Sequence, residues 1–188
     1  MSWNLRLLTT INGWSGNAVL DAVMRSCATY LIFAVFAVLA ALSLASLRRR
    51  AVRPVGLAGV TLVVALAVNL LGARLHPELR PFQTQPVHQL IAHADGQSFP
   101  SDHATAAFAV ALAVLVFLSR RWGVVLLIAA ALVAFSRVYA GLHYPGDVLG
   151  GAAAGLLGLA MALVGERLTR RAGRPPGAPT SPTPLGAS

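Results

Sequence analysis

Five long apolar runs without a charged residue constrain this chain more than any other feature of its sequence. They cover residues 26–47, 54–73, 104–119, 122–136 and 148–165. A helix rises about 1.5 Å per residue, so the first, second and last runs are long enough, or nearly so, to cross roughly 30 Å of hydrocarbon. Only 11% of the residues are charged, against about 25% in ordinary soluble domains. The sequence therefore predicts an all-α, polytopic membrane helix bundle of about five transmembrane helices.

The segment before these runs, residues 4–25, would have to enter the bilayer to give a sixth helix. Its charged residues Arg6, Asp21 and Arg25 argue against that placement. Trp3 and Trp14 are typical of the membrane–water interface. We therefore expect one or two interfacial helices here.

The net charge of +9 comes from arginine, because the chain contains no lysine. The arginines cluster at alternate ends of the apolar runs, at Arg48, Arg49, Arg50 and Arg53, at Arg120 and Arg121, and at Arg167, Arg170, Arg171 and Arg174. The positive-inside rule makes these ends cytoplasmic. Since the charge is placed as a topology signal, we expect no nucleic-acid partner.

The opposite ends hold most of the polar residues. All five histidines and four of the six acidic residues fall within 74–103 or 137–147. Prolines prevent residues 74–103 from forming one helix, although residues 87–93 could form a short one. Residues 173–188 are rich in proline and small residues, which predicts a disordered cytoplasmic tail behind an integral-membrane domain of residues 1–172.

Small residues recur in the last apolar run. Gly151 and Gly155 are four residues apart, with Ala154 and Gly158 beside them. This spacing lets helix backbones approach closely, and we favour packing within the bundle over a dimer interface. The oligomeric state does not follow from the sequence.

Two arginines, Arg80 and Arg137, lie at the outer membrane border with no acidic residue one helical turn away. A guanidinium group suits phosphate because its flat fork binds two oxygens at once. Asp102 and His103 open the third apolar run, where the N-terminus of a helix stabilises an anion. This end of the bundle is therefore suited to bind a phosphate group.

A second pair, His143 and Asp147, is spaced to meet across one helical turn, and Pro145 suits the first turn of the helix that follows. An aspartate that accepts from one imidazole nitrogen fixes the tautomer and leaves the other nitrogen free as a nucleophile. His103 could then protonate a leaving group. These residue types together favour phosphoryl transfer.

The stretch "SRVYAGLHYPGD", residues 136–147, resembles the third signature of the type-2 phosphatidic acid phosphatase superfamily, which is S-R, five residues, H, three residues, D. "PSDH" at residues 100–103 resembles the second signature, P-S-G-H, and Arg80–Pro81 resembles the end of the first. The motif "HQLIAHADGQSFPSDHA" and the N-terminal "INGWSG" are similar to those of BcrC-like undecaprenyl-diphosphate phosphatases. The resemblance covers roughly residues 5–165 and implies the core that this superfamily shares with haloperoxidases.

The chain departs from the family pattern at two positions. The lysine that begins the first signature is replaced by Ala73, and Arg74 beside it is the candidate to take over its charge. Asp102 stands where the usual pattern has glycine. If its backbone N–H faces phosphate, its carboxylate must point elsewhere to avoid repelling the substrate.

The resemblance implies that His143 attacks the terminal phosphorus of undecaprenyl diphosphate in the outer leaflet, that Asp147 orients it, and that His103 protonates the departing lipid monophosphate. The phosphate oxygens would be held by Arg80, Arg137, Arg74, Ser101 and the backbone of residues 101–103, which includes Asp102. No metal or other cofactor is implied. The protein would lie in the bacterial inner membrane, with its active site on the extracytoplasmic side and its tail in the cytoplasm.

Other functions remain open at this stage. The same chemistry could act on phosphatidate, phosphatidylglycerophosphate or another prenyl phosphate. A non-catalytic protein that binds or transports lipid anions would use the arginines and need no nucleophile. A metal site could be built from His76, His88, His93 and Asp95, although the separation of His88 and His93 misses the one-turn spacing of helical ligands. The related haloperoxidases are large soluble proteins, which disfavours their chemistry here.

Overall fold

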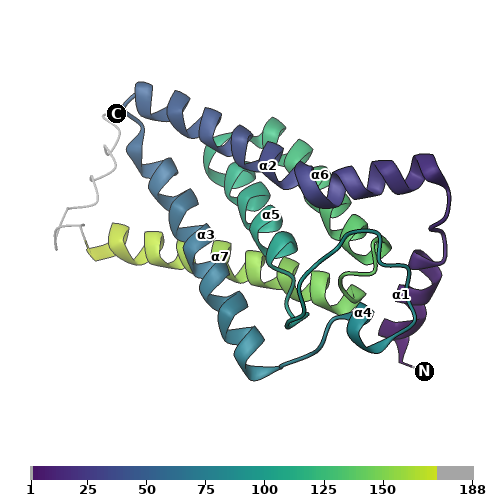
Figure 1. Ribbon diagram of the computed structural model, residues 1–188. Helices are drawn as coiled ribbons and strands as arrows, with labels where there is room; N and C mark the ends of the chain where they lie inside the picture. Colours follow the sequence, from purple (N-terminus) through teal and green to yellow (C-terminus); the bar gives the residue numbers. More distant parts are fainter. Residues whose placement is uncertain (1, 173–188) are drawn as a thin grey trace, which may run out of the picture.

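The computed structural model describes residues 2–172, and they are mostly helical (Figure 1). The predicted disordered tail, residues 173–188, lies outside the described part. The elements in chain order are α1 (Trp3–Asn12), α2 (Ala18–Arg48), α3 (Val52–Leu75), α4 (Pro81–Thr84), α5 (Asp102–Ala113), the π-helical segment η1 (Val114–Leu118), α6 (Arg120–Tyr139) and α7 (Pro145–Ala172). Residues 2–172 contain no β-strand, as predicted.

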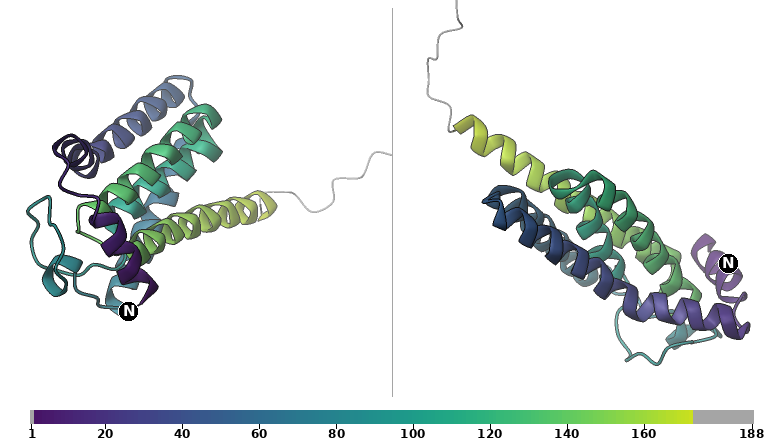
Figure 2. Two further views of the ribbon diagram at one scale, coloured as in Figure 1. Left: turned by 90° about the vertical axis from the view of Figure 1, so that its right-hand side faces the viewer. Right: turned by 90° about the horizontal axis from the view of Figure 1, so that it is seen from above.

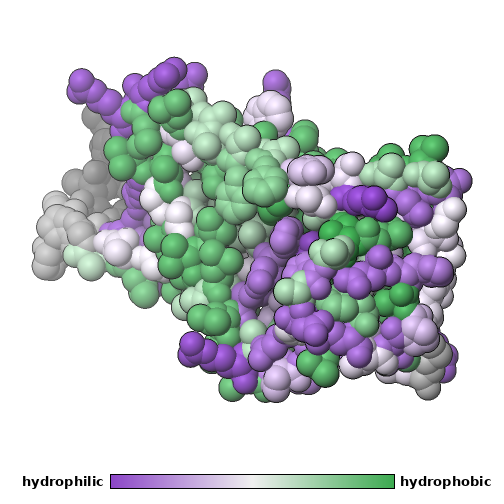
Figure 3. Space-filling model, in the orientation of Figure 1, coloured by the Kyte–Doolittle hydropathy of each residue, from purple (hydrophilic) through white to green (hydrophobic). Residues whose placement is uncertain are grey.

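Four helices are long and apolar enough to cross a membrane, namely α2, α3, α6 and α7. The remaining predicted span is the shorter apolar helix Asp102–Leu118, formed by α5 and η1. Large hydrophobic side chains such as Tyr30, Phe33 and Ile128 are exposed on the outside of the bundle. Figure 3 shows hydrophobic residues over much of the helical surface, while hydrophilic residues gather over the end that carries the long loop. This pattern fits a multi-pass membrane protein.

The N-terminal region contains one separate short helix where one or two were expected. Only α1 is a separate short helix, whereas residues 18–25 form the first turns of α2 instead of a second interfacial helix. The side chain of Asn17 caps α2 by accepting hydrogen bonds from the backbone N–H groups of Val19 and Leu20. Residues 87–93, which could have formed a short helix, do not form one, and the helical turn of this loop lies earlier, in α4.

The glycines of α7 let this helix pack closely against its neighbours. A Cβ atom at Gly155 would lie 2.9 Å from the backbone nitrogen of Ala109 in α5. A Cβ atom at Gly158 would lie 2.9 Å from Ala65 in α3. These small residues therefore pack α7 within the bundle, which is the role that the sequence favoured. Helix α5 lies at the centre of the bundle, in contact with α2, α3, α6 and α7 (Figures 1 and 2).

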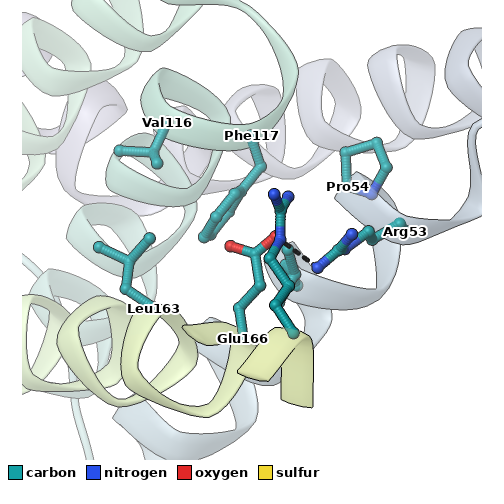
Figure 4. Close-up of a pocket in the computed structure, with 8 residues that line it drawn as sticks. Arg53, Pro54, Val116, Phe117, Leu163 and Glu166 are labelled. Carbon is teal, nitrogen blue, oxygen red and sulfur yellow. Dashed lines mark hydrogen bonds and ion pairs between the residues drawn. The ribbon is translucent and has the colours of Figure 1, made fainter. Parts of the chain in front are cut away.

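The two ends of the bundle differ in character. The end without histidines has a pocket of about 330 Å³ lined by Arg53, Pro54, Leu57, Val116, Phe117, Leu163, Glu166 and Arg170. In this pocket Arg53 and Arg170 both contact Oε1 of Glu166, at 3.0 and 2.9 Å (Figure 4). The Arg53–Glu166 pair joins α3 to α7, whereas the Arg170–Glu166 pair lies within α7. The long loop, α1 and the turn between α6 and α7 lie together at the other end, as the two views of Figure 2 show.

Candidate active site

Most of the predicted site residues meet at this second end. Arg80 precedes α4, Ser101 and His103 lie at the start of α5, and Arg137 lies in the last turn of α6. His143 and Asp147 lie just before and within the first turn of α7. Arg80, Ser101, Arg137, His143 and Asp147 are all buried, and His103 is half-buried. The tertiary structure thus collects residues that are up to 67 positions apart in the chain.

The environment of His143 distinguishes its two ring nitrogens. Nδ1 lies 2.9 Å from the backbone carbonyl oxygen of Ser98 and 3.3 Å from Oδ2 of Asp147. Because these oxygens are acceptors, Nδ1 is the nitrogen that carries the proton. Nε2 lies 3.5 Å from Nη1 of Arg80, a group that can only donate. Nε2 therefore presents its lone pair, as a nucleophile requires.

The carboxylate of Asp147 is held by more than its contact with His143. Its Oδ2 atom accepts hydrogen bonds from the backbone N–H of Tyr144, at 2.7 Å, and from the Ser98 hydroxyl. Ser98 is fully buried and was not singled out by the sequence analysis. It lies within the "HQLIAHADGQSFPSDHA" stretch that resembles BcrC-like phosphatases, and this resemblance was the available signal for the residue.

Several buried donors at the site lack a protein partner. Within the described residues, these include Nε of Arg80, Nε of Arg137 and Oγ of Ser101. Nη1 of Arg137 contacts the backbone oxygen of Ala28 at 3.5 Å. Buried polar groups are nearly always hydrogen-bonded in proteins, so these donors are available to a ligand that accepts hydrogen bonds. A phosphate group can accept from all of them.

At the start of α5, one of the expected backbone donors is already paired. The backbone N–H of Ser101 donates to the carbonyl oxygen of Asp147 at 3.1 Å, so this N–H is not free for a ligand. The N–H groups of the first helical turn, from Asp102 onward, have no intrahelical acceptor. The carboxylate of Asp102 points toward α3, where Oδ1 accepts from Nδ2 of Asn69 at 2.6 Å. The sequence-based expectation that this carboxylate turns away from a phosphate is compatible with this contact.

Arg74 is not brought into the cluster. It lies exposed in the last turn of α3, and among the described residues it has no hydrogen bond or ion pair with another predicted site residue. The four residues considered for a metal site do not converge either. His76 lies 3.9 Å from Glu78, the backbone of His88 bonds to Asn12, and His93 contacts Arg80. Residues 2–172 contain no group of three side chains that could hold a metal ion.

His93 joins the site instead. Its Nδ1 lies 3.1 Å from the backbone oxygen of Ala94, and its Nε2 lies 3.5 Å from Nη1 of Arg80. His93 and His143 thus both face the same nitrogen of Arg80. The "HADG" sequence around His93 is part of the family resemblance, which was the available signal for this residue.

Burial affects the charges of these groups. It lowers the pKa of the His143 imidazole, and the Arg137 and Arg80 guanidinium groups act in the same direction, whereas Asp147 raises this pKa. Burial also lowers the pKa of His93. The hydrogen bond to Ala94 raises this pKa, whereas the charges of Arg80 and Arg137 lower it further. Both histidines are therefore neutral at pH 7. Burial lowers the pKa of Arg80 as well, while the nearby Asp102 and Asp147 carboxylates raise it.

Helix α1 fastens the loops that carry the site. The Asn12 side chain donates to the backbone oxygens of His88, at 2.9 Å, and Tyr139, at 2.8 Å. Its Oδ1 atom accepts from the backbone N–H of His88. Asn4 accepts from the backbone N–H of Gly146 at 2.8 Å. The N-terminal helix is therefore part of the structure that supports the site.

Comparison with known proteins places this arrangement in a family. Undecaprenyl-diphosphatase BcrC of Bacillus subtilis is 39% identical over 148 residues, which are 78% of this chain and 76% of that protein. The putative undecaprenyl-diphosphatase YbjG of Escherichia coli is 43% identical over 100 residues, or 53% of this chain and 50% of that protein. The crystal structure of Aquifex aeolicus LpxE matches with a TM-score of 0.72 and 25% identity, covering 87% of this chain and 96% of that one. The family model of the PAP2 superfamily matches residues 53–170. The chain belongs to the PAP2 superfamily.

Proposed function

We propose that this protein is a membrane lipid phosphatase that removes the terminal phosphate of undecaprenyl diphosphate through a phosphohistidine intermediate. The observation that carries the proposal is the environment of His143. Its Nδ1–H is held by Ser98 and Asp147, and its Nε2 lone pair faces the guanidinium group of Arg80, whose Nε has no partner within residues 2–172. The named undecaprenyl-diphosphatases among its relatives support the choice of substrate. Residues 1–172 form the proposed phosphatase domain.

In the first step, Nε2 of His143 attacks the terminal phosphorus. The bond between this phosphorus and the bridging oxygen breaks, and His103 gives its proton to that oxygen as undecaprenyl phosphate leaves. The Asp147 carboxylate stabilises the positive charge that develops on the imidazole. The products of this step are the lipid monophosphate and a phosphorylated His143.

In the second step, His103 takes a proton from water, and the water oxygen attacks the phosphorus of the phosphohistidine. The N–P bond breaks, inorganic phosphate leaves, and the lone pair returns to Nε2 of His143. Arg80, Arg137, the Ser101 hydroxyl and the N-terminus of α5 hold the three equatorial oxygens through both steps. Arg74 is exposed and makes no contact with the other site residues of the described chain. In this mechanism it therefore only attracts the anionic headgroup.

The arginine pattern supports an orientation in the membrane. The positive-inside rule places the arginine-rich end, with the Arg53–Glu166–Arg170 ion pairs, in the cytoplasm. The site then faces the extracytoplasmic side of the bacterial inner membrane, and the substrate arrives from the outer leaflet. The tail of the lipid stays in the bilayer while its headgroup enters the site.

Phosphate release by the purified full-length protein in detergent, with a chelator present, tests the proposal. The substrates are undecaprenyl diphosphate and phosphatidate, and the variants are wild type and His143→Ala. We expect release from the prenyl lipid and its loss in the variant. A preference for phosphatidate would retain the mechanism and change the substrate. Absence of release from both lipids by folded wild-type protein would refute the proposal and favour a binding or transport function.

A further inference from the structure

A buried amide in α3 contacts the start of the proposed phosphate site. Asn69 is 6% exposed although α3 is otherwise largely apolar. Its Nδ2 donates to Oδ1 of Asp102 at 2.6 Å, and its Oδ1 accepts from the Thr105 hydroxyl at 2.7 Å. Asn69 therefore joins α3 to the first turn of α5, which carries His103.

The chemistry of the partners fixes the orientation of this amide. A carboxylate can only accept, so the NH₂ group of Asn69 must face Asp102. The amide oxygen is then left to Thr105, whose hydroxyl can donate. If the amide were flipped, its oxygen would face the carboxylate, and the two acceptors would repel each other. The contact thus works in one orientation only.

Asp102 needs such a partner because of its position. It lies in the first turn of α5, beside Ser101, where the helix N-terminus is proposed to bind phosphate. It is also near enough to Arg80 to raise the pKa of that guanidinium group. A carboxylate free to rotate here would compete with the substrate for Arg80 and would repel the phosphate oxygens. The glycine found at this position in the usual family signature has no such side chain.

We propose that Asn69 is a positioning residue that restrains the Asp102 carboxylate against α3 and so keeps negative charge out of the phosphate subsite. This inference rests on the proposed function, since it takes the start of α5 as the place where phosphate binds. It assigns a task to a residue outside the three signature motifs. It also explains how the chain accommodates an acid where the family pattern has glycine.

The experiment compares five full-length proteins in detergent: wild type, Asn69→Ala, Asp102→Gly, the double variant Asn69→Ala/Asp102→Gly, and Thr105→Val. Two quantities are measured for each, the KM for undecaprenyl diphosphate and the Kd for inorganic phosphate by calorimetry. We expect Asn69→Ala to raise both on the order of tenfold, because the freed carboxylate opposes the phosphate. The double variant should return to within about twofold of Asp102→Gly, since no charge then needs restraint.

Thr105→Val is the matched control. It removes the second hydrogen bond of the same amide but leaves the contact between Asn69 and Asp102. We expect its thermal stability to fall, because the Asn69 oxygen loses its donor, while KM and Kd stay near the wild-type values. If Asn69→Ala fails to fold, Asn69→Asp replaces it, because this isosteric side chain can keep the Thr105 bond but not donate to a charged Asp102.

The outcomes separate this inference from the proposed function. Unchanged KM and Kd in Asn69→Ala would overturn the inference and leave Asn69 a packing role. A double variant that binds phosphate as weakly as Asn69→Ala would do the same. A wild type that binds phosphate but releases none from lipid would refute the proposed function. The Kd values of the variants would still decide the role of Asn69 in that case.

Discussion

The backbone carbonyl oxygen of Ser98 lies 2.9 Å from Nδ1 of His143, closer than the 3.3 Å between this nitrogen and Oδ2 of Asp147. Two acceptors therefore share the proton of Nδ1, and one of them is a main-chain group that substitution does not remove. The Ser98 hydroxyl completes the arrangement by donating to Oδ2 of Asp147. A residue outside the three signature motifs thus contacts both members of the proposed nucleophilic pair.

Replacement of Ser98 by alanine tests the contribution of its hydroxyl. The backbone contact to His143 remains, but Asp147 loses one of the donors that orient its carboxylate. We expect kcat to fall roughly tenfold with KM nearly unchanged, because the hydroxyl acts on the nucleophile and not on the bound lipid. Steady-state kinetics with undecaprenyl diphosphate measures both constants. Thr61→Val, which removes a buried hydroxyl that donates to the backbone oxygen of Leu57 in α3, is the control. Equal losses in the two variants would contradict a specific role for Ser98.

Arg80 should be sensitive even to a change that keeps its charge. The geometry of its guanidinium group allows Nη1 to face both histidines while Nε remains available to a ligand. Lysine offers a single ammonium group without this fork. We expect Arg80→Lys to lower kcat/KM by roughly 10²-fold and Arg80→Ala by more. Arg121→Ala, an exposed arginine at the other end of the bundle, should retain the wild-type value. A fully active Arg80→Lys variant would show that charge alone suffices.

The lowered pKa of His143 predicts how stability depends on pH. Its ordinary value is 6.5, so between that pH and the lower pKa of the folded state the unfolded chain binds more protons. Stability therefore rises with pH across this window, is fully present above about 6.5, and is lost as the pH falls toward the folded pKa. We expect the Tm in detergent to drop between pH 7.5 and 5, and to drop less in His143→Asn. The same pH slope in both proteins would count against burial of a neutral His143.

The glycines of α7 offer a matched pair for stability. A Cβ atom at Gly158 would collide with the backbone oxygen of Thr61 and lie 2.9 Å from Ala65, whereas one at Gly165 would meet nothing within 4 Å. We expect Gly158→Ala to destabilise the protein by about 1–3 kcal/mol through overpacking. Gly165→Ala should be neutral or stabilising by up to about 1 kcal/mol, because alanine favours the helix. Thermal unfolding in detergent compares the two, and a stable Gly158→Ala variant would argue against the close packing of α3 and α7.

Much of the architecture follows from local sequence properties. Uncharged apolar runs of sufficient length predict membrane helices because backbone groups in lipid must be paired within the segment. The start of α2 at residue 18 was not predicted, because Asp21 and Arg25 suggested a segment at the membrane interface. The Asn17 cap and the apolar residues around Asp21 and Arg25 extend α2 to this point. The motif spacing also placed His143 and Asp147 one turn apart, and they are in contact.

The remaining features of the site depend on contacts between distant segments, which no local pattern encodes. Ser98 reaches Asp147, Asn69 reaches Asp102, and His93 reaches Arg80, in each case between different elements or loops. The sequence alone determined the class of fold, the end of the bundle that holds the polar residues and the chemical types available there. The tertiary structure decided which of these residues meet and which nitrogen of His143 keeps its lone pair. The physical reason is that burial makes unpaired polar groups costly, so helix packing selects the set of side chains that can pair with one another.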